Sequence, residues 1–297
     1  METPVEWYDE PYVSKERIVR TAEALGIPGL RMFGKFTMNN AAAPLVPHFH
    51  KNAYEFTFVT NGTITFTIGE ESYEVNGFDV FMTGPDVVHS TNLLPLSAGE
   101  MFWFQLDTTE TDSFLFLAPE AREHLLGTLS SMDGPLLAGC GGRIFHLLKR
   151  AFELSASPSG RYTCAACLTL ILYELEALSK KTVRSLTPDM EKAVHYIKEH
   201  ITEELSIEEL ATLCGLSASQ FKQKFKAQVG IAPRHYINYR KIQTAKKLLT
   251  DGVPVTEVAM ALGFNSSSYF TVVFRRYNAC SPSEYIQKKA NDPALLS

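Results

Sequence analysis

Residues 206–233 read SIEELATLCGLSASQFKQKFKAQVGIAP, and residues 254–282 read PVTEVAMALGFNSSSYFTVVFRRYNACSP. The second stretch repeats the pattern of the first, since the apolar and acidic positions of 207–211 recur at 255–259 and a Phe-x-x-x-Phe pair follows in each. One glycine near the middle of each copy marks a tight turn between two helical patterns. The repeat therefore predicts two copies of one supersecondary unit, a helix-turn-helix.

Local signals support helices within the first copy and between the copies. Ser206 precedes Glu209, and Ser217 precedes Gln220, at the spacing of a capping box, which starts a helix. Residues 235–250 are predicted to form one linking helix with a continuous apolar side. The basic residues of that helix are predicted to lie on its other side or at its edges: Arg240, Lys241, Lys246 and Lys247.

Charge is divided unevenly along the 297 residues. Residues 1–183 carry 13 Lys and Arg against 22 Asp and Glu, whereas residues 184–297 carry 15 against 11. Within 220–290 the numbers are 12 basic and 3 acidic. A basic module joined to an acidic one favours a polyanionic partner such as nucleic acid. An uneven but purely solvated surface is the alternative that charge alone leaves open.

A repeated helix-turn-helix on a basic module predicts a double-stranded DNA partner, because a helix fits the major groove and two readers can enter grooves about 34 Å apart. The outward faces of the two second helices are predicted to carry DNA contacts: Ser219, Gln220, Gln223, Lys224, Ser268, Tyr269 and Arg276. Val272 and Val273 are predicted to lie on the same outward face. Lys222, Lys226 and Arg275 flank the inward face and are predicted to contact phosphates. Three alternatives remain open, namely that Gln220 only closes its cap, that Lys224 is only solvated, and that Tyr269 packs internally.

The N-terminal half has a different pattern. Between residues 31 and 106, β-branched and aromatic runs alternate with turn residues, and many short strands at this spacing predict a sandwich or a barrel. Asn61-Gly62, between two such runs, predicts a β-hairpin. After about residue 119, apolar periodicity predicts helices over 120–129, 144–154 and 164–178.

Four potential metal ligands lie within the strand-rich region. His48 and His50 are two residues apart on a predicted strand, so their side chains point to the same face. With Glu55 and His89 they would make a three-histidine, one-carboxylate site for a divalent metal. Two other roles for the same residues remain open: direct contacts to a polar ligand, or purely structural hydrogen bonds.

The spacing of these four residues, with Gly62 and Gly77 between them, resembles the two motifs of the cupin barrel. Residues 188–288 resemble the DNA-binding domain of the AraC/XylS family of transcription regulators in the duplicated unit, Gly263-Phe264 and Ser268-Tyr269-Phe270. The chain departs from that family at Asn278-Ala279, where an aromatic-Gly pair is common, and at Val272, where Arg is frequent.

The resemblance implies an α+β chain of two domains: a cupin-like β-barrel followed by helices over residues 1–183, and an all-α domain over 184–297 with helix-turn-helix units at about 206–233 and 254–282. It implies a regulator, not an enzyme, that binds a small effector, often a sugar. The implied effector contacts are His48, His50, Glu55, His89 and Trp103, with a metal at the first four as an option. It also implies an activator that contacts RNA polymerase.

A homodimer is expected through a leucine-rich stripe at helical spacing, although the same stripe could instead pack against the barrel: Leu168, Ile171, Leu172, Leu175 and Leu178. Two other functions remain open from the sequence: a metal-dependent cupin enzyme, an isomerase or dioxygenase, and a scaffold that binds proteins through 114–178. With 45% hydrophobic and 21% charged residues, the composition excludes a disordered or collagen-like chain. Five scattered cysteines and an acidic start without a signal-peptide pattern favour a cytoplasmic protein without a membrane span.

Overall fold

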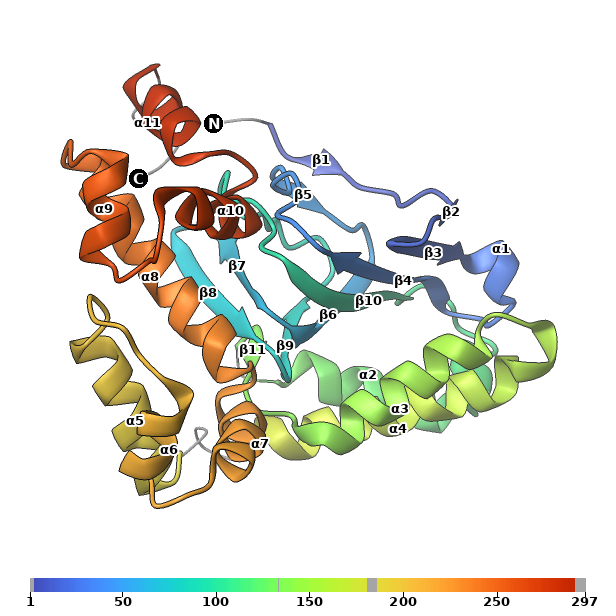
Figure 1. Cartoon of the computed structure of the whole chain (residues 1–297). Helices are drawn as coiled ribbons and strands as arrows, with labels where there is room; N and C mark the ends of the chain where they lie inside the picture. Colours follow the sequence, from blue (N-terminus) through green and yellow to red (C-terminus); the bar gives the residue numbers. More distant parts are fainter. Residues whose placement is uncertain (1–2, 133, 181–185, 292–297) are drawn as a thin grey trace.

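The computed structural model describes residues 3–132, 134–180 and 186–291. The predicted domain boundary between residues 183 and 184 lies outside the described residues. The strand-rich half and its helices form one body, and a purely helical half lies against its side (Figure 1). The predicted α+β class, a β-rich domain with helices followed by a helical domain, is therefore confirmed.

The N-terminal domain is built on a seven-stranded sheet in the order β11-β9-β6-β10-β4-β3-β2, with two small two-stranded sheets, β1-β5 and β7-β8. Strand β6 lies near the centre of the large sheet and pairs antiparallel with both β9 and β10. The strands are β1 Val5–Glu6, β2 Tyr12–Val13, β3 Arg17–Thr21, β4 Leu30–Met38, β5 His48–Phe49, β6 Ala53–Asn61, β7 Thr63–Ile68, β8 Glu71–Asn76, β9 Asp79–Thr83, β10 Gly99–Asp107 and β11 Leu136–Leu137.

The hairpin predicted at Asn61-Gly62 is wrong. Strand β6 ends at Asn61 and β7 begins at Thr63, but among the described strands β7 pairs with β8 and not with β6, so the chain turns a corner from the large sheet into a separate one. Gly62 has φ +96°, and a Cβ there would lie 2.7 Å from the carbonyl oxygen of Ala98. The glycine therefore allows a sharp bend and a close backbone approach rather than a hairpin turn.

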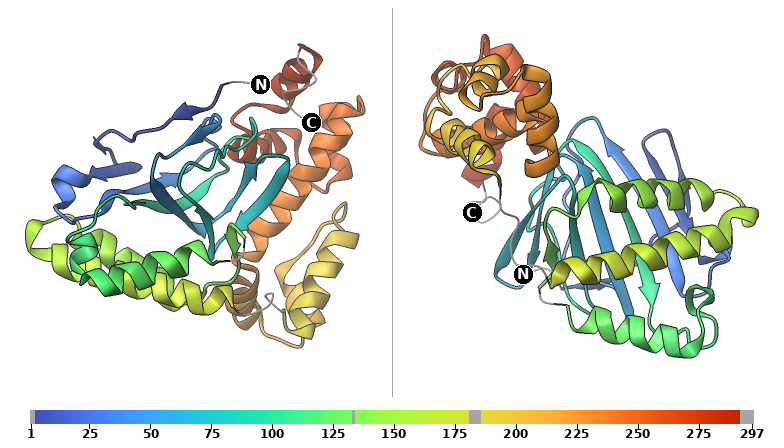
Figure 2. Two further views of the ribbon diagram at one scale, coloured as in Figure 1. Left: turned by 180° about the vertical axis from the view of Figure 1, so that it is seen from behind. Right: turned by 90° about the horizontal axis from the view of Figure 1, so that it is seen from below.

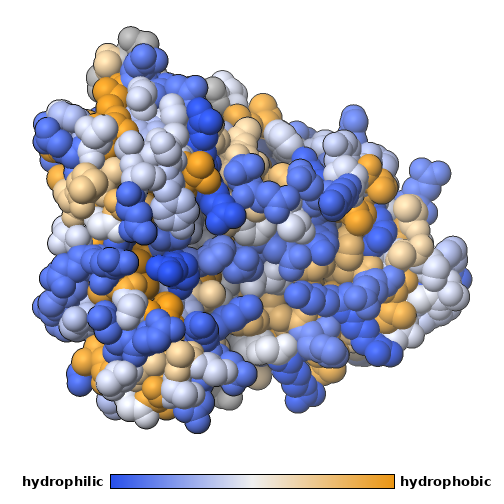
Figure 3. All heavy atoms as spheres, viewed as in Figure 1, coloured by the Kyte–Doolittle hydropathy of each residue, from blue (hydrophilic) through white to orange (hydrophobic). Residues whose placement is uncertain are grey.

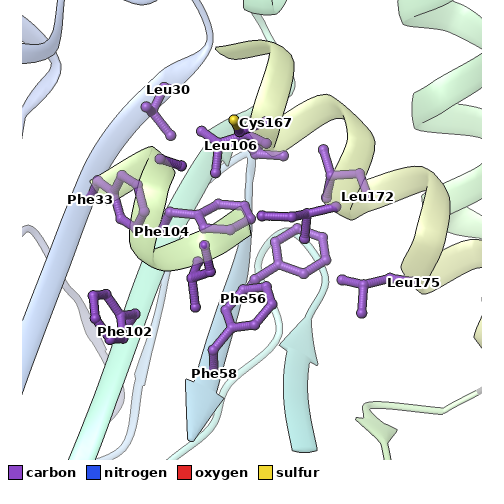
Figure 4. Close-up of a cluster of buried hydrophobic side chains, with 14 of the residues drawn as sticks. Leu30, Phe33, Phe56, Phe58, Phe102, Phe104, Leu106, Cys167, Leu172 and Leu175 are labelled. Atoms are coloured by element: carbon purple, nitrogen blue, oxygen red, sulfur yellow. The ribbon is translucent and has the colours of Figure 1, made fainter. Parts of the chain in front are cut away.

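Alternation along the strands divides the side chains between two cores. On β6 and β10, Phe56, Phe58 and Phe104 point toward the helices, where they meet Leu172 and Leu175 (Figure 4). The helices of this domain are α1 Ala22–Leu25, α2 Pro119–Ser130, α3 Gly141–Leu154 and α4 Arg161–Ser179, with short 3₁₀ turns at Phe114–Phe116 and Pro158–Gly160. Helices α2, α3 and α4 all lie on one face of the sheet (Figure 2).

The leucine-rich stripe of α4 belongs to this core. Leu168, Ile171, Leu172 and Leu175 are all fully buried, and Leu178 packs at the edge of the same cluster. The stripe therefore holds the helix against the sheet, and its predicted use as a dimer interface is wrong. Cys164 and Cys167 are free thiols buried on the same side, as expected for small core residues.

The segment Pro158–Ser179 is also the one described helix that is long and apolar enough to cross a membrane by length and composition. In the structure its apolar side is covered by the sheet and by α2 and α3. This arrangement is typical of a core helix of a globular domain.

The C-terminal domain is helical throughout the part that the structure describes. It comprises α5 Pro188–Glu199, α6 Ile207–Leu213, α7 Ala218–Val229, α8 Pro233–Thr250, α9 Val255–Ala261, α10 Ser267–Asn278 and α11 Pro282–Asn291. Both predicted capping boxes are present, at the starts of α6 and α7, and the predicted linking helix is α8. On the face shown in Figure 3, apolar side chains are scattered among hydrophilic ones rather than gathered in one large patch.

Two separate hydrophobic clusters hold this domain together. The first contains Phe221, Phe225 and Ile237, and the second contains Tyr239, Phe270 and Phe274. The change from one cluster to the other falls within α8, between Ile237 and Tyr239. Each helix-turn-helix therefore has its own core, and the linking helix contributes to both.

Candidate effector and DNA-binding sites

The histidines converge inside the barrel, as their spacing predicts. His48 on β5 pairs with His89 through two backbone hydrogen bonds, of 3.0 and 2.9 Å, which places the two imidazole rings 4.2 Å apart. His50 follows β5, and its ring centroid lies 5.2 Å from that of His48. One nitrogen from each of the three rings lies within 4.8 Å of the others. Glu55 approaches from β6, with Oε2 3.0 Å from Nε2 of His50 and Oε1 3.5 Å from Nε2 of His89.

The backbone around the histidines sets the state of each ring. Nδ1 of His48 lies 2.7 Å from the carbonyl oxygen of Val46, and Nδ1 of His89 lies 3.0 Å from that of Val87. Nδ1 of His50 lies 3.1 Å from a third carbonyl oxygen, that of Trp7. A carbonyl oxygen only accepts, so each Nδ1 must donate, and a neutral ring then has its lone pair on Nε2. This is the tautomer that metal-binding histidines adopt when a carbonyl orients them.

The electrostatics of the cluster are unusual for buried groups. Burial and then His89 lower the pKa of His48 to about 4, so this ring is neutral at pH 7. Burial disfavours the charged form of His50, but the Glu55 carboxylate outweighs it and raises the pKa of His50. Burial alone would raise the pKa of Glu55, but His50 and His89 hold it well below its usual range. The site thus contains a carboxylate facing imidazole nitrogens.

These donors fit a divalent cation. Three imidazole nitrogens and one carboxylate form a common set for zinc, iron or manganese. Nε2 of His89 is buried and has no hydrogen-bond partner among the described residues. His48, His50 and His89 could therefore hold a metal, with Glu55 as a fourth ligand.

A cavity of about 310 Å³ opens beside the cluster. Apart from His48, His50 and Glu55, its lining is largely apolar and aromatic and includes Trp7, Phe36, Phe66, Met101 and Trp103. Trp103, predicted as an effector contact, lies in this wall, whereas His89, also predicted as one, is not among the lining residues. Three other aromatic residues of the same strands, Tyr54, Phe56 and Phe102, belong to the helix-facing core instead.

Several cavity residues were not predicted from the sequence. The N-terminal segment covers the cavity: Arg17 pairs with Asp9 at 3.0 Å, and Nε1 of Trp103 donates to the same carboxylate at 3.2 Å. Burial and then the charge of Glu55 raise the pKa of Asp9. Gln105, also unpredicted, donates from Nε2 to Oε2 of Glu55 at 3.0 Å. The alternation of β10 could have indicated Gln105, since it lies two residues from Trp103.

In the helical domain, most of the predicted reading residues are exposed. On the second helix of each unit, the exposed members are Ser219, Gln220, Lys222, Gln223, Lys226, Ser268, Tyr269, Val272, Arg275 and Arg276. Tyr269 is 52% exposed, which excludes internal packing. Val273 is buried at 1% exposure, so its predicted place on the outward face is wrong.

Two of these residues already have partners within the domain. Oε1 of Gln220 accepts the Ser217 backbone N–H at 3.0 Å, so its side chain closes the capping box of α7. Nζ of Lys224 donates to Oδ2 of Asp189 at 2.7 Å, and Asp189 lies in the first turn of α5. Lys224 is thus neither a free DNA contact nor simply solvated. A DNA phosphate would have to compete with Asp189 for it.

The barrel touches both helix-turn-helix units. Beside the first, Gly77 follows β8 and abuts Gly230 after α7 so closely that a Cβ on Gly77 would overlap the Gly230 carbonyl. In the second, the backbone N–H of Ala98 donates to the carbonyl oxygen of Arg276 on α10 at 2.8 Å. β8 lies alongside α8 in both ribbon views (Figures 1 and 2), where Tyr239 donates to Oε2 of Glu74 at 2.9 Å.

Comparison with known proteins finds a match in each half of the chain. A helix-turn-helix domain model matches residues 210–288, and a cupin domain model matches residues 36–105. The helix-turn-helix match lies in the C-terminal half and the cupin match in the N-terminal half, as the sequence predicted for each.

Two curated relatives are similar to a large part of the chain. The chain is 34% identical to the probable transcriptional regulator LumQ of Photobacterium leiognathi, over 62% of this chain and 62% of that protein. It is 31% identical to the HTH-type transcriptional regulator ExsA of Pseudomonas aeruginosa, over 56% of this chain and 60% of that protein. The chain thus spans about three fifths of the length of these relatives. They are regulators and not enzymes, which leaves the metal-dependent enzyme without support.

Among solved structures, ToxT of Vibrio cholerae, bound to a naphthalenyl butenoic acid, aligns with 95% of this chain and 100% of that chain. The identity is 17% and the TM-score 0.35.

Proposed function

We propose that this chain is a sequence-specific DNA-binding transcription regulator that responds to a small effector bound in the barrel. The observation that carries the proposal is the pair of capped helix-turn-helix units joined by α8, each with an exposed polar and basic face on its second helix. Because the related regulators are bacterial proteins, we place it in the cytoplasm, where bacterial DNA lies.

A binding selection tests the DNA-binding part. The full chain is used to enrich duplexes from a random library, and the winning duplex is titrated over a salt series. The proposal includes three phosphate contacts, from Lys222, Lys226 and Arg275. A plot of log affinity against log salt concentration should therefore have a slope of about −3. Failure to enrich any sequence, together with a slope near zero, would exclude the proposal.

The effector is proposed to be a small polar molecule with hydroxyl groups, such as a sugar. A cavity of about 310 Å³ with tryptophan and phenylalanine walls suits stacking on a sugar ring, and Glu55, Asp9 and Arg17 supply charged hydrogen-bonding groups. A thermal-shift screen of sugars and small acids tests this, because a ligand that binds only the folded state raises Tm. Trp103→Ala should remove the shift of any hit.

A divalent metal in the histidine cluster is proposed as part of the same site. The tautomers fixed by backbone carbonyls support it, as does the buried Nε2 of His89, which faces Glu55 at 3.5 Å without forming a hydrogen bond. Metal analysis of the purified chain should give close to one ion per chain, and His48→Ala with His50→Ala should abolish it. Substoichiometric metal in the wild type, with ligand binding unchanged by a chelator, would contradict the metal.

The effector signal is proposed to reach DNA through the contact between the domains. Leu96 lines the cavity, and Ala98, two residues later, is bonded to the recognition helix α10. A shift of this segment on ligand binding would therefore act directly on Arg276. The family resemblance favours activation through RNA polymerase over repression, which a promoter–reporter assay with and without the gene decides.

A homodimer remains proposed, but through a different face of α4. Tyr162 and Leu170 are exposed on the side away from the sheet, at 57% and 39%, and Phe116 lies against Tyr162 with its ring centroid 4.6 Å away. A second copy of this chain would cover these rings. The monomer–dimer equilibrium in sedimentation velocity tests this proposal.

A further inference from the structure

Lys241 lies between the two helix-turn-helix units, and the solvent-facing position expected from helical periodicity is wrong. It is 5% exposed although it lies on the linking helix α8. Ile242, the next residue, belongs to the second hydrophobic cluster, and Ile237 belongs to the first. The lysine therefore sits just past the point where α8 passes from one core to the other.

Its ammonium group joins backbone from both units. Nζ donates at 2.9 Å to the carbonyl oxygen of Glu203, in the loop between α5 and α6 of the first unit. It donates at 2.6 Å to the carbonyl oxygen of Leu262, the C-cap of α9 in the second unit. A cation at a helix C-terminus is favoured by the helix dipole. Both acceptors are fixed in the backbone, so the lysine spans the two units at defined points.

The same place is where the two units touch. A Cβ on Gly263, in the turn between α9 and α10, would lie 3.2 Å from the carbonyl carbon and oxygen of Glu203 and 3.2 Å from Nζ of Lys241. Gly263 also has φ +64°, which favours glycine for a second reason. The turn that leads into recognition helix α10 is thus pressed against a loop of the other unit, with the ammonium group joining them.

We propose that Lys241 is a positioning residue: by tying the loop at Glu203 to the turn at Leu262, it fixes the separation and relative orientation of α7 and α10. This inference rests on the proposed DNA-binding function, because a fixed separation matters only to two readers on one duplex. Its amine points into the domain and is not a phosphate contact. Without this tie, the two cores, which share none of their described residues, are connected through α8 and through the contacts that each unit makes with the barrel.

The first test needs no DNA, so its outcome is independent of the proposed function. Spin labels on unnatural amino acids at Thr212 on α6 and Met260 on α9, both exposed, report the distance between the units in the full chain. Wild type should give one narrow distance distribution. Lys241→Met should broaden it, whereas the control Lys247→Met, an exposed lysine on the same helix, should leave it narrow.

The variants are checked for folding by circular dichroism, and Lys241→Gln, which keeps two N–H donors on a shorter side chain, replaces Lys241→Met if the latter unfolds. An unchanged distribution in the folded variant overturns the proposal.

The second test uses DNA. Duplexes carrying the selected site are prepared with the spacer between its two halves lengthened or shortened by one base pair. Wild type should discriminate against the altered spacers by about tenfold, and Lys241→Met by less than about twofold, because a rigid bivalent reader requires matched spacing. Lys247→Met should keep the wild-type discrimination. Equal discrimination by wild type and Lys241→Met would leave DNA binding intact but exclude this role for Lys241.

Discussion

Ala279 ends helix α10 in a conformation that suits glycine. Its φ is +51°, and its backbone N–H donates to the carbonyl oxygen of Arg275 as the cap of the helix. Left-handed backbone crowds a Cβ, so a non-glycine residue here is strained. The same position departs from the AraC/XylS pattern, in which an aromatic-Gly pair is common where this chain has Asn278-Ala279.

Ala279→Gly should therefore stabilise the helical domain by about 1 kcal/mol. The measurement is denaturant unfolding followed by circular dichroism. The matched control is Ala166→Gly, at an exposed position inside α4, which should lose about 1 kcal/mol because glycine is a poor helix former. Destabilisation by Ala279→Gly would contradict the strained cap.

Lys224 shows what a local pattern cannot predict. Helical periodicity placed it on an outward face, but its partner Asp189 is 35 residues away on another helix. Asp189→Asn should release the lysine for phosphate and make the salt slope of DNA binding steeper by about 1. Asp112→Asn, on an exposed loop of the barrel domain, changes net charge equally and should leave the slope unchanged. Identical slopes for the two variants would mean that Lys224 does not reach DNA.

The same limit explains the other unpredicted residues. Asp9 and Trp7 lie far along the chain from the histidines. The pairing of β1 with β5 and the bonds of Asp9 to Arg17 and Trp103 bring the N-terminal segment over the cavity. In contrast, the convergence of His48, His50 and Glu55 could be predicted, because strand alternation and a short separation determine it.

Among the elements, those with strong local signals were predicted well. The capping boxes of α6 and α7, the linking helix α8 and the helices α2 to α4 are confirmed within a few residues. The hairpin at Asn61-Gly62 failed because a two-residue turn signal does not say whether the next strand pairs back or leaves for another sheet. Which strands pair with each other depends on contacts between residues that are far apart in the sequence.

Helix α4 shows that a periodic stripe identifies a buried face but not its partner. Its leucine stripe packs on the barrel, so a dimer must use the opposite side, where Leu170 is exposed. Leu170→Glu should shift the chain toward monomer in sedimentation velocity, because a carboxylate would be buried at the contact. Val88→Glu, at a similarly exposed barrel position, should not. A wild type that is monomeric at micromolar concentration, with and without effector, would argue against this interface.

The two domains meet along β8 and the segment that ends at Ala98, so the chain should unfold as a coupled unit. Gly77→Ala should separate them, because the new methyl group would overlap the Gly230 carbonyl, whereas no positive φ strains Gly77 itself. Calorimetry should then show the helical domain melting apart from the barrel, and the Ala98 amide should exchange faster with solvent.

Gly84→Ala is the control for this variant, since its Cβ would meet only side chains at 3.7 and 3.8 Å. A single unchanged transition in Gly77→Ala, with the Ala98 amide still protected, would show that the contact does not couple the domains.

Both helix-turn-helix units are proposed to read one duplex side by side. Hydroxyl-radical footprinting of the full chain on its selected duplex tests it most directly. The account predicts two protected patches on one face of the DNA, about one helical turn or 34 Å apart, with one lost on Gln223→Ala and the other on Arg276→Ala. A single patch, or two patches that both survive these substitutions, would contradict it.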